Sequence, residues 1–246
     1  MLTIKFLYGV LFFACLFSST ILSQSINGEY KFPLRPGMPE WRTLKTHDDM
    51  LKVLQLPSNV LTSISTDSLA HTCLNYPLFL DIWAFDNIQK GFKHVRKGFN
   101  GFEELFLRKD AHNIISKIYM GIDPSKIIDE KTPLKKGTYQ INICKLEILL
   151  SQEELLQNIS LNEGKELLQN MINKNTKMSQ YAEYGIMDIE TNVYLMLKIL
   201  LKSNSKLVKK MVDQKNIKDL LSNGKLTNID TANDIILIAK NYLNEQ

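Results

Sequence analysis

Apolar residues recur three, four or seven positions apart through long stretches of this chain. An α-helix turns once every 3.6 residues, so this spacing places the apolar side chains on one helix face. The longest series is Leu74, Leu78, Ile82, Phe85, Phe92, Val95, Phe99, Phe102 and Phe106. Apolar and polar residues do not alternate with a period of two over any useful length, so no strand is expected. The pattern predicts an all-α fold of stacked short antiparallel helix pairs, forming an irregular helical bundle or an α-superhelix.

Capping residues and prolines divide the first part of this pattern into separate helices. Thr46 and Asp49 fit a capping box at the start of one helix, and Pro57 ends it. A short helix then closes before Ser65, which can cap the next one, and Asp110 can cap a later helix. Further helices are predicted near 139–150, 152–158, 162–174, 187–203, 205–221 and 231–244.

The chain is expected to form one continuous helical domain after a leader and a lead-in. The predicted segments are a signal peptide at 1–23, an extended lead-in at 24–40, an N-terminal helical half at 41–120, a connection at 121–138 and a C-terminal helical half at 139–246. Prolines and glycines punctuate both the lead-in and the connection, which is why neither is predicted to be helical.

A short unit occurs three times at unequal separations. It reads LTSIST at 61–66, LQNISL at 156–161 and LTNIDT at 226–231. Each copy has a leucine, an isoleucine three residues later, and then a serine or aspartate ahead of a predicted helix. We expect this unit to close one short helix and cap the next, as stacked antiparallel helix pairs require.

The first residues have the layout of a secretory signal. Lys5 precedes an apolar stretch at 6–17 that is too short for a stable membrane span, and small polar residues follow it. Cleavage is expected near Gln24, which makes the mature chain exported, periplasmic or secreted. Lipid anchoring at Cys15 is a less favoured alternative, and a retained anchor is another. No later segment is long and apolar enough to cross a bilayer, so no transmembrane span is expected in the mature chain.

Composition and motifs exclude several classes of function. A net charge of +4, with 44% hydrophobic and 23% charged residues, is ordinary for a globular protein and too weakly basic to indicate nucleic acid. The basic and aromatic stretch at 91–102 is explained by an amphipathic helix. There is no CxxC pair, HExxH, glycine-rich phosphate loop or EF-hand spacing, so neither a cofactor nor a metal is expected.

Four residues near the centre of the first half are the candidates for catalysis: His71, Cys73, Asp81 and His94. A cysteine nucleophile needs a base within hydrogen-bond reach. On a helix, residues two apart such as His71 and Cys73 point in different directions. A buried, structural Cys73 is therefore favoured over a catalytic one.

The two cysteines outside the leader, Cys73 and Cys144, leave two interpretations open. In an exported protein they can form one disulfide. Alternatively both are buried thiols, since a free cysteine packs like a small hydrophobic residue. Cys144 lies at helical spacing from Ile141 and Ile148, which favours burial.

The stretch NYPLFLDIWAFDN at 75–87 is predicted to be the centre of the first half. Pro77 fits the first turn of a helix, with Asn75 as its cap. Leu78, Ile82 and Phe85 then share one face, which we expect to be buried.

Several segments together resemble a group of uncharacterised exported proteins of Bacteroidota bacteria. They are PGMPEWRTLKTHDDMLKVLQLP, CLNYPLFLDIWAFDNIQKGF, FNGFEELFLRKDA and YGIMDIETNVYLMLKILLKSN. The resemblance implies export and an all-helical fold, and it points to the bacterial cell envelope as the location. It also draws attention to Ser68 and Thr231, each preceded by aspartate, as O-glycosylation sites of the kind such bacteria use. Helix capping is the alternative explanation for both.

Two hypotheses of function follow. The first is a non-catalytic exported protein that binds or scaffolds a partner protein or an envelope component. The second is a hydrolase-type enzyme whose site is assembled from scattered residues around Cys73. A deep pocket with two or more perturbed titratable groups would favour the enzyme, and a shallow, apolar-rimmed groove would favour the binding protein.

Overall fold

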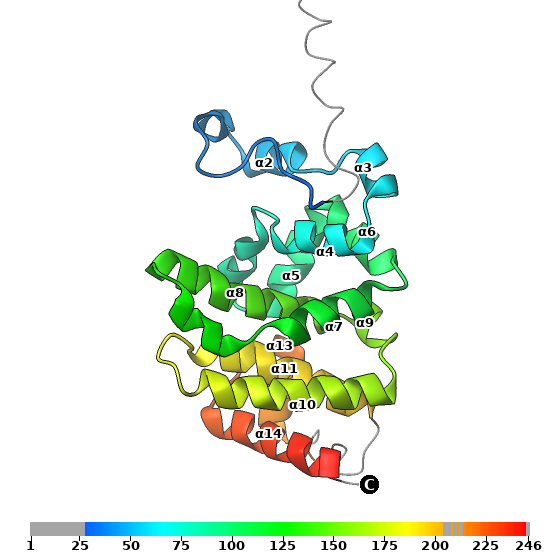
Figure 1. Cartoon of the computed structure of the whole chain (residues 1–246), viewed down its shortest axis with the longest axis vertical. Helices are drawn as coiled ribbons and strands as arrows, with labels where there is room; N and C mark the ends of the chain where they lie inside the picture. The colour runs from blue at the N-terminus through cyan, green and yellow to red at the C-terminus, as the bar shows by residue number, and fades with distance from the viewer. Residues whose placement is uncertain (1–27, 204–207, 209–210, 212–213, 245–246) are drawn as a thin grey trace, which may run out of the picture.

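The computed structural model describes residues 28–203, 208, 211 and 214–244. Within these residues all regular structure is helical, which confirms the all-α prediction (Figure 1). In the same residues no helix combines the length and the apolar character needed to cross a membrane. The predicted signal peptide at 1–23, with Lys5 and Cys15, lies outside the described residues.

The helices stack along the long axis of the molecule largely in sequence order, from α2 and α3 at one end to α14 at the other (Figure 1). In this notation η marks a 3-10 helix. The first part comprises η1 (Pro39–Thr43), α2 (His47–Val53), α3 (Ser58–Ser63), α4 (Thr66–Leu74), η2 (Phe79–Ala84), α5 (Ile88–Lys97), α6 (Asn100–Leu107) and α7 (Ala111–Gly121). The second part comprises η3 (Pro124–Asp129), α8 (Pro133–Leu150), α9 (Glu153–Leu156), α10 (Leu161–Met178), α11 (Ile186–Lys202), α13 (Lys215–Asn223) and α14 (Ile229–Asn244).

The local capping signals in the sequence are mostly realised. Thr46 and Asp49 form the predicted capping box of α2, and Ser65 accepts a hydrogen bond from a backbone amide at the start of α4. Ser160 and Glu163 form a second capping box at α10. These side chains satisfy amides that a helix leaves without an intrahelical partner, so they fix where each helix begins.

The third copy of the short unit caps its helix differently. In the first two copies the isoleucine is buried and the serine after it is the cap. In the third, Asn228 accepts hydrogen bonds from the backbone and the hydroxyl of Thr231. Helix α14 therefore starts at Ile229, two residues earlier than the unit predicts, and Ile229 is exposed.

Two further predictions are wrong in detail. The connection predicted at 121–138 contains η3 and the start of α8, because Pro133 occupies the first turn of α8 and Thr132 caps it. Asp110 precedes α7 but makes no capping bond. Its carboxylate instead accepts a hydrogen bond of 2.9 Å from the hydroxyl of Thr66, which ties the start of α7 to the start of α4.

Buried apolar residues from both predicted halves form one continuous core. Its densest aromatic part lies between α4, η2, α5 and α6. There Phe102 packs edge-on against Phe79, Phe92 and Phe99, with ring centroids 5.3–5.6 Å apart. Edge-to-face packing of this kind adds to the hydrophobic gain from burying the rings.

The centre of the first half differs from the prediction in a way that matters for the site. Asn75 ends α4 rather than capping a new helix, and Pro77 lies in a turn before η2. A 3-10 helix has three residues per turn, so Phe79 and Ile82 share its buried side. Phe85 lies beyond the end of η2 and is 38% exposed, so its predicted place in the core is wrong.

Candidate functional site

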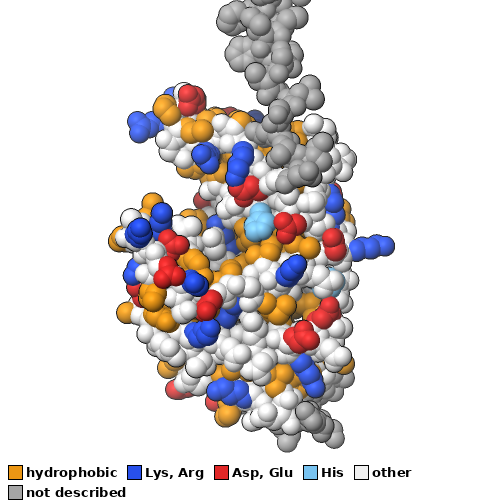
Figure 2. All heavy atoms as spheres, in the orientation of Figure 1, with side chains coloured by type: hydrophobic (Ala, Val, Ile, Leu, Met, Phe, Trp, Pro, Cys, Tyr) orange, Lys and Arg blue, Asp and Glu red, His pale blue; other side chains and the backbone are white. Residues whose placement is uncertain are grey.

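A hollow of about 220 Å³ opens between α2, η2 and α5. Figure 2 shows this face of the molecule notched between the end that carries α2 and the helices beneath it. Nine residues line the hollow: His47, Leu51, Tyr76, Leu78, Asp81, His94, Val95, Lys97 and Gly98.

One wall of the hollow is a histidine and carboxylate pair. His47 is the first residue of α2, so the capping box just before it fixes its position. Its Nε2 lies 3.1 Å from Oδ2 of Asp81 in η2. A carboxylate only accepts hydrogen bonds, so Nε2 must carry the hydrogen, and Asp81 sets the orientation of the imidazole.

A second histidine extends this wall. The ring of His94 on α5 stacks against that of His47, with centroids 6.1 Å apart. On another side it contacts Phe85, at 5.0 Å. The exposed position of Phe85 therefore has a local explanation, because this ring packs against His94 instead of joining the core.

Tyr76 has a buried hydroxyl that contributes no hydrogen bond to the described part of the fold. Its ring lies flat against Phe99, with centroids 4.3 Å apart, and the residue is only 2% exposed. Its buried hydroxyl has no hydrogen-bond partner among the described residues. Burial, reinforced by the charge of Asp81, raises the pKa of Tyr76 well above its ordinary value. The hydroxyl therefore stays protonated as an unused donor, which buried polar groups of folded proteins rarely are.

The hollow combines an apolar wall with a few titratable side chains. Its wall is mainly apolar, from Leu51, Leu78 and Val95. Among the described residues there is no group of three His, Cys, Asp or Glu side chains arranged to hold a metal ion.

The four candidate catalytic residues lie in two separate places. Asp81 and His94 line the hollow, whereas His71 and Cys73 lie on α4 outside it. Cys73 is completely buried, and burial raises the pKa of its thiol. A buried thiol with a raised pKa is a poor nucleophile, which argues against Cys73 as the centre of a hydrolytic site.

The remaining predicted site residues are also buried. Cys73 and Cys144 are free thiols, and Cys144 donates a hydrogen bond of 3.4 Å to Asp188. Ser68 is 6% exposed and Thr231 is fully buried. Their hydroxyls bond within the caps of α4 and α14, so a glycan on either residue would require these helix starts to open.

The sequence did not point to a buried polar cluster around Glu147 of α8. Its carboxylate accepts hydrogen bonds from Tyr119, Thr191 and Asn192, at 2.5–2.8 Å. Burial raises the pKa of Glu147 to about 7. The only hint in the sequence is that Glu147 is the one charged residue in the otherwise apolar segment at 146–150. The cluster joins α7, α8 and α11, and none of its members lines the hollow.

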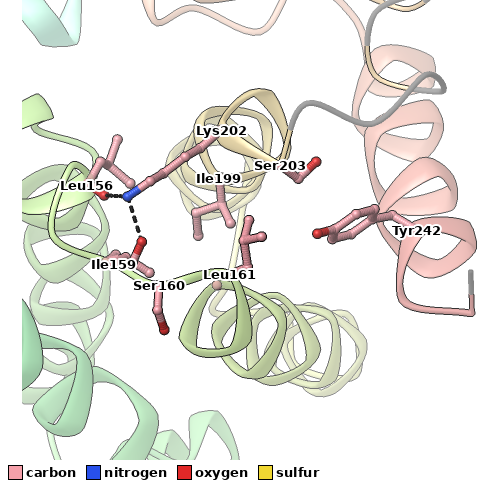
Figure 3. Close-up of a pocket in the computed structure, with 9 residues that line it drawn as sticks. Leu156, Ile159, Ser160, Leu161, Ile199, Lys202, Ser203 and Tyr242 are labelled. Carbon is pink, nitrogen blue, oxygen red and sulfur yellow. Dashed lines mark hydrogen bonds between the residues drawn. The ribbon is translucent and has the colours of Figure 1, made fainter. Parts of the chain in front are cut away.

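A second, smaller recess lies between α10, α11 and α14, with Tyr242 at its edge (Figure 3). Its only cation, Lys202, is turned away from the recess, and its ammonium donates hydrogen bonds to the backbone carbonyls of Leu156 and Ile159. This ammonium satisfies carbonyls at the end of α9, so its role is structural.

Three polar residues that line the hollow were not among the candidates named from the sequence: His47, Tyr76 and Lys97. Histidine signatures for catalysis or metal binding rely on fixed local spacing, and His47 has none. Comparison with family models, curated proteins and solved structures finds no match to this chain.

Proposed function

We propose that this chain is an exported, non-catalytic protein of the bacterial cell envelope that holds a ligand or a group of a partner in the hollow between α2, η2 and α5. The observation that carries the proposal is a mainly apolar hollow of about 220 Å³ with the pair of His47 and Asp81 in its wall.

The composition of the hollow supports binding rather than turnover. Ligand sites are concave, largely apolar, and carry a few polar groups that fix orientation. Here the apolar side chains of Leu51, Leu78 and Val95 form the bulk of the wall, while His47, Asp81 and His94 supply polar groups. A mainly apolar wall supports the binding protein over the enzyme.

Export and an envelope location are supported by different features. The basic, apolar and small-residue order of the first 23 residues is typical of a secretory signal. The resemblance to exported Bacteroidota proteins points to the same compartment.

The proposal is tested with a variant that fills the hollow. A Cβ atom on Gly98 would lie 2.9 Å from Cδ2 of Leu51, so valine at this position displaces Leu51 and occupies the cavity. Gly121→Val is the matched control, because a Cβ atom there meets nothing within 4 Å. The chain from residue 24 onward is recovered from the native envelope, and bound proteins and small molecules are identified by mass spectrometry.

We expect one reproducible bound component with the wild type and with Gly121→Val, and its loss with Gly98→Val. If the same component is recovered with Gly98→Val, the hollow is not the binding surface. If no component is recovered reproducibly with the wild type, the proposal that this protein binds a component of the envelope is rejected.

A hydrolase-type enzyme remains the second candidate function because the pair of His47 and Asp81 is the arrangement that orients a general base. This enzyme would have its site in the hollow and not around Cys73. Ester hydrolysis by the wild type, His47→Ala and Asp81→Asn distinguishes the two functions. Equal background rates for all three support binding, and turnover that both substitutions abolish supports the enzyme.

A further inference from the structure

The size of the hollow limits the apolar part of its ligand to about one ring. An apolar cavity of about 150 Å³ holds a benzene molecule in engineered proteins. At about 220 Å³, the hollow accommodates a six-membered ring with one short substituent. Its apolar lining comes from Leu51, Leu78 and Val95. These side chains form no hydrogen bonds, so the part of a ligand that contacts them must itself be apolar.

The polar groups that line the hollow are not equally available to a ligand. Oδ2 of Asp81 lies 3.1 Å from Nε2 of His47, so both of these groups already have a partner. The ring of His94 contacts His47 and Phe85, but it forms no hydrogen bond within the described residues. An imidazole carries at least one N–H in either protonation state, so His94 can donate a hydrogen bond to a ligand.

Lys97 supplies a charge without a partner at the same end of the hollow. Its side chain is exposed, and its ammonium forms no hydrogen bond or ion pair within the described part of the chain. Residues three apart are neighbours on a helix surface, so His94 and Lys97 lie on the same side of α5. The ammonium is carried on a flexible four-carbon stem, which allows it to move toward a group bound beside His94.

These donors favour an anionic group over a neutral or a cationic one. A hydrogen bond or contact from a charged donor to an anion is stronger than one between neutral groups. A cation would instead meet the ammonium of Lys97, while the carboxylate of Asp81 is already bonded to His47. His94 and Lys97 are both exposed, so an anion beside them keeps part of its hydration and avoids the full cost of burying a charge.

We infer that the hollow binds a small organic anion, such as a carboxylate, whose apolar part is about one ring in size. The ring lies against Leu51, Leu78 and Val95, and the anionic group accepts from His94 and Lys97 at the edge of the hollow. This inference rests on the proposed function, since it names the ligand class of the same site.

Four probes separate the alternatives. Benzoate is an anion with a ring, benzamide is its neutral counterpart, benzylamine is cationic, and acetate is an anion without a ring. Each is titrated into the chain from residue 24 onward by calorimetry or by ligand-observed NMR. Thermal melts check that every variant is folded.

The variants test the two donors and the space separately. Lys97→Glu reverses the charge at the hollow. Its matched control is Lys117→Glu, which makes the same change of net charge at an exposed position of α7 that does not line the hollow. His94→Phe keeps a ring between His47 and Phe85 and removes the N–H. Gly98→Val fills the hollow, with Gly121→Val as its control.

We expect benzoate to bind the wild type, Lys117→Glu and Gly121→Val most tightly of the four probes. Lys97→Glu should weaken benzoate about fivefold or more and leave benzamide unchanged, because only the anion responds to the charge. His94→Phe should weaken benzoate about fivefold, which corresponds to one hydrogen bond. Gly98→Val should abolish binding of both ring compounds that accept a hydrogen bond.

The outcomes separate this inference from the proposed function. Benzamide or benzylamine binding as tightly as benzoate overturns the anionic class, and acetate binding as tightly overturns the role of the apolar wall. Equal losses with Lys97→Glu and Lys117→Glu overturn the role of Lys97, and unchanged binding with His94→Phe overturns that of His94. If no probe binds while an envelope component is still lost with Gly98→Val, the ligand class fails and the proposed function stands. If that component is also absent, both are rejected.

Discussion

Gly91 of α5 lies directly against the backbone of Ile82 in η2. A Cβ atom at position 91 would overlap the carbonyl oxygen of Ile82, and would also lie 2.9 Å from its Cα and carbonyl carbon. No other pair of elements in the first part of the described chain is shown to approach so closely at a glycine. This contact holds η2 on α5, and through η2 it places Asp81 opposite His47.

Gly91→Ala is therefore expected to destabilise the protein. The backbone of Ile82 cannot rotate out of the way as a side chain can, so the two elements must move apart, at a cost of about 2 kcal/mol or more. Urea melts measure the change in the free energy of unfolding. Gly137→Ala in α8 is the control, because a Cβ atom there meets nothing within 4 Å and alanine favours a helix by about 0.5–1 kcal/mol. An unchanged midpoint for Gly91→Ala would contradict the close contact.

Phe79 and Phe85 should respond differently to truncation. Phe79 is fully buried between Phe92 and Phe102, so Phe79→Ala leaves a cavity and should cost about 3–5 kcal/mol. Phe85 is 38% exposed, so Phe85→Ala should cost about 1 kcal/mol or less. The two urea midpoints test this directly. Equal losses would place Phe85 in the core, as the helical spacing alone predicts.

This pair of phenylalanines shows what the sequence can and cannot predict. The caps at Thr46, Ser65 and Ser160 depend on residues three positions apart, so they could be found from local patterns. The segment after Pro77 adopts a 3-10 helix instead of the expected α-helix, which changes the side that each residue faces. Local spacing cannot reveal that change.

The hollow could not be predicted from the sequence, for a related reason. His47, Asp81 and His94 come from three separate elements, and no fixed spacing connects them. Their meeting depends on the contact of Gly91 with Ile82, and a glycine in the sequence does not show which backbone it will touch. Asp81 and His94 could be named only as members of a scattered group, without a place for them to meet.

Glu147 should make the stability depend on pH. Its folded pKa of about 7 lies above its ordinary value of 4.5, so the folded state binds more protons between these values. Stability from the protonated carboxyl is full below pH 4.5 and is lost as pH rises through 7. For a completely buried group the loss is roughly 3 kcal/mol. Asp188, whose pKa burial also raises, contributes in the same direction.

Glu147→Gln isolates this contribution. The amide keeps an oxygen for Tyr119 and Asn192, and its nitrogen can donate to Thr191, whose hydroxyl has a second acceptor in Met187. Unfolding free energies are measured from pH 5 to 7, below the range in which Lys145 and Lys174, each with a pKa lowered by burial to about 8, complicate the profile. We expect a flatter profile than that of the wild type. Parallel profiles would show that Glu147 does not titrate in this range.

Neither Cys73 nor Cys144 should react with a thiol reagent in the folded protein. Both are buried free thiols, and burial raises the pKa of each. In the chain from residue 24 onward, two thiols should titrate with Ellman's reagent in urea without reductant, and almost none in buffer. If no thiol titrates in urea, the cysteines form the disulfide that the sequence left open.

The hydroxyl of Tyr76 should lower the stability of the unliganded protein. Tyr76→Phe removes a buried donor that has no partner among the described residues and keeps the ring against Phe99. We expect the free energy of unfolding to rise by about 1–2 kcal/mol in urea melts. Tyr119→Phe is the same chemical change at a hydroxyl that bonds Glu147 and Asn192, so it should lower stability. If both variants lose stability alike, Tyr76 has a structural partner within the protein.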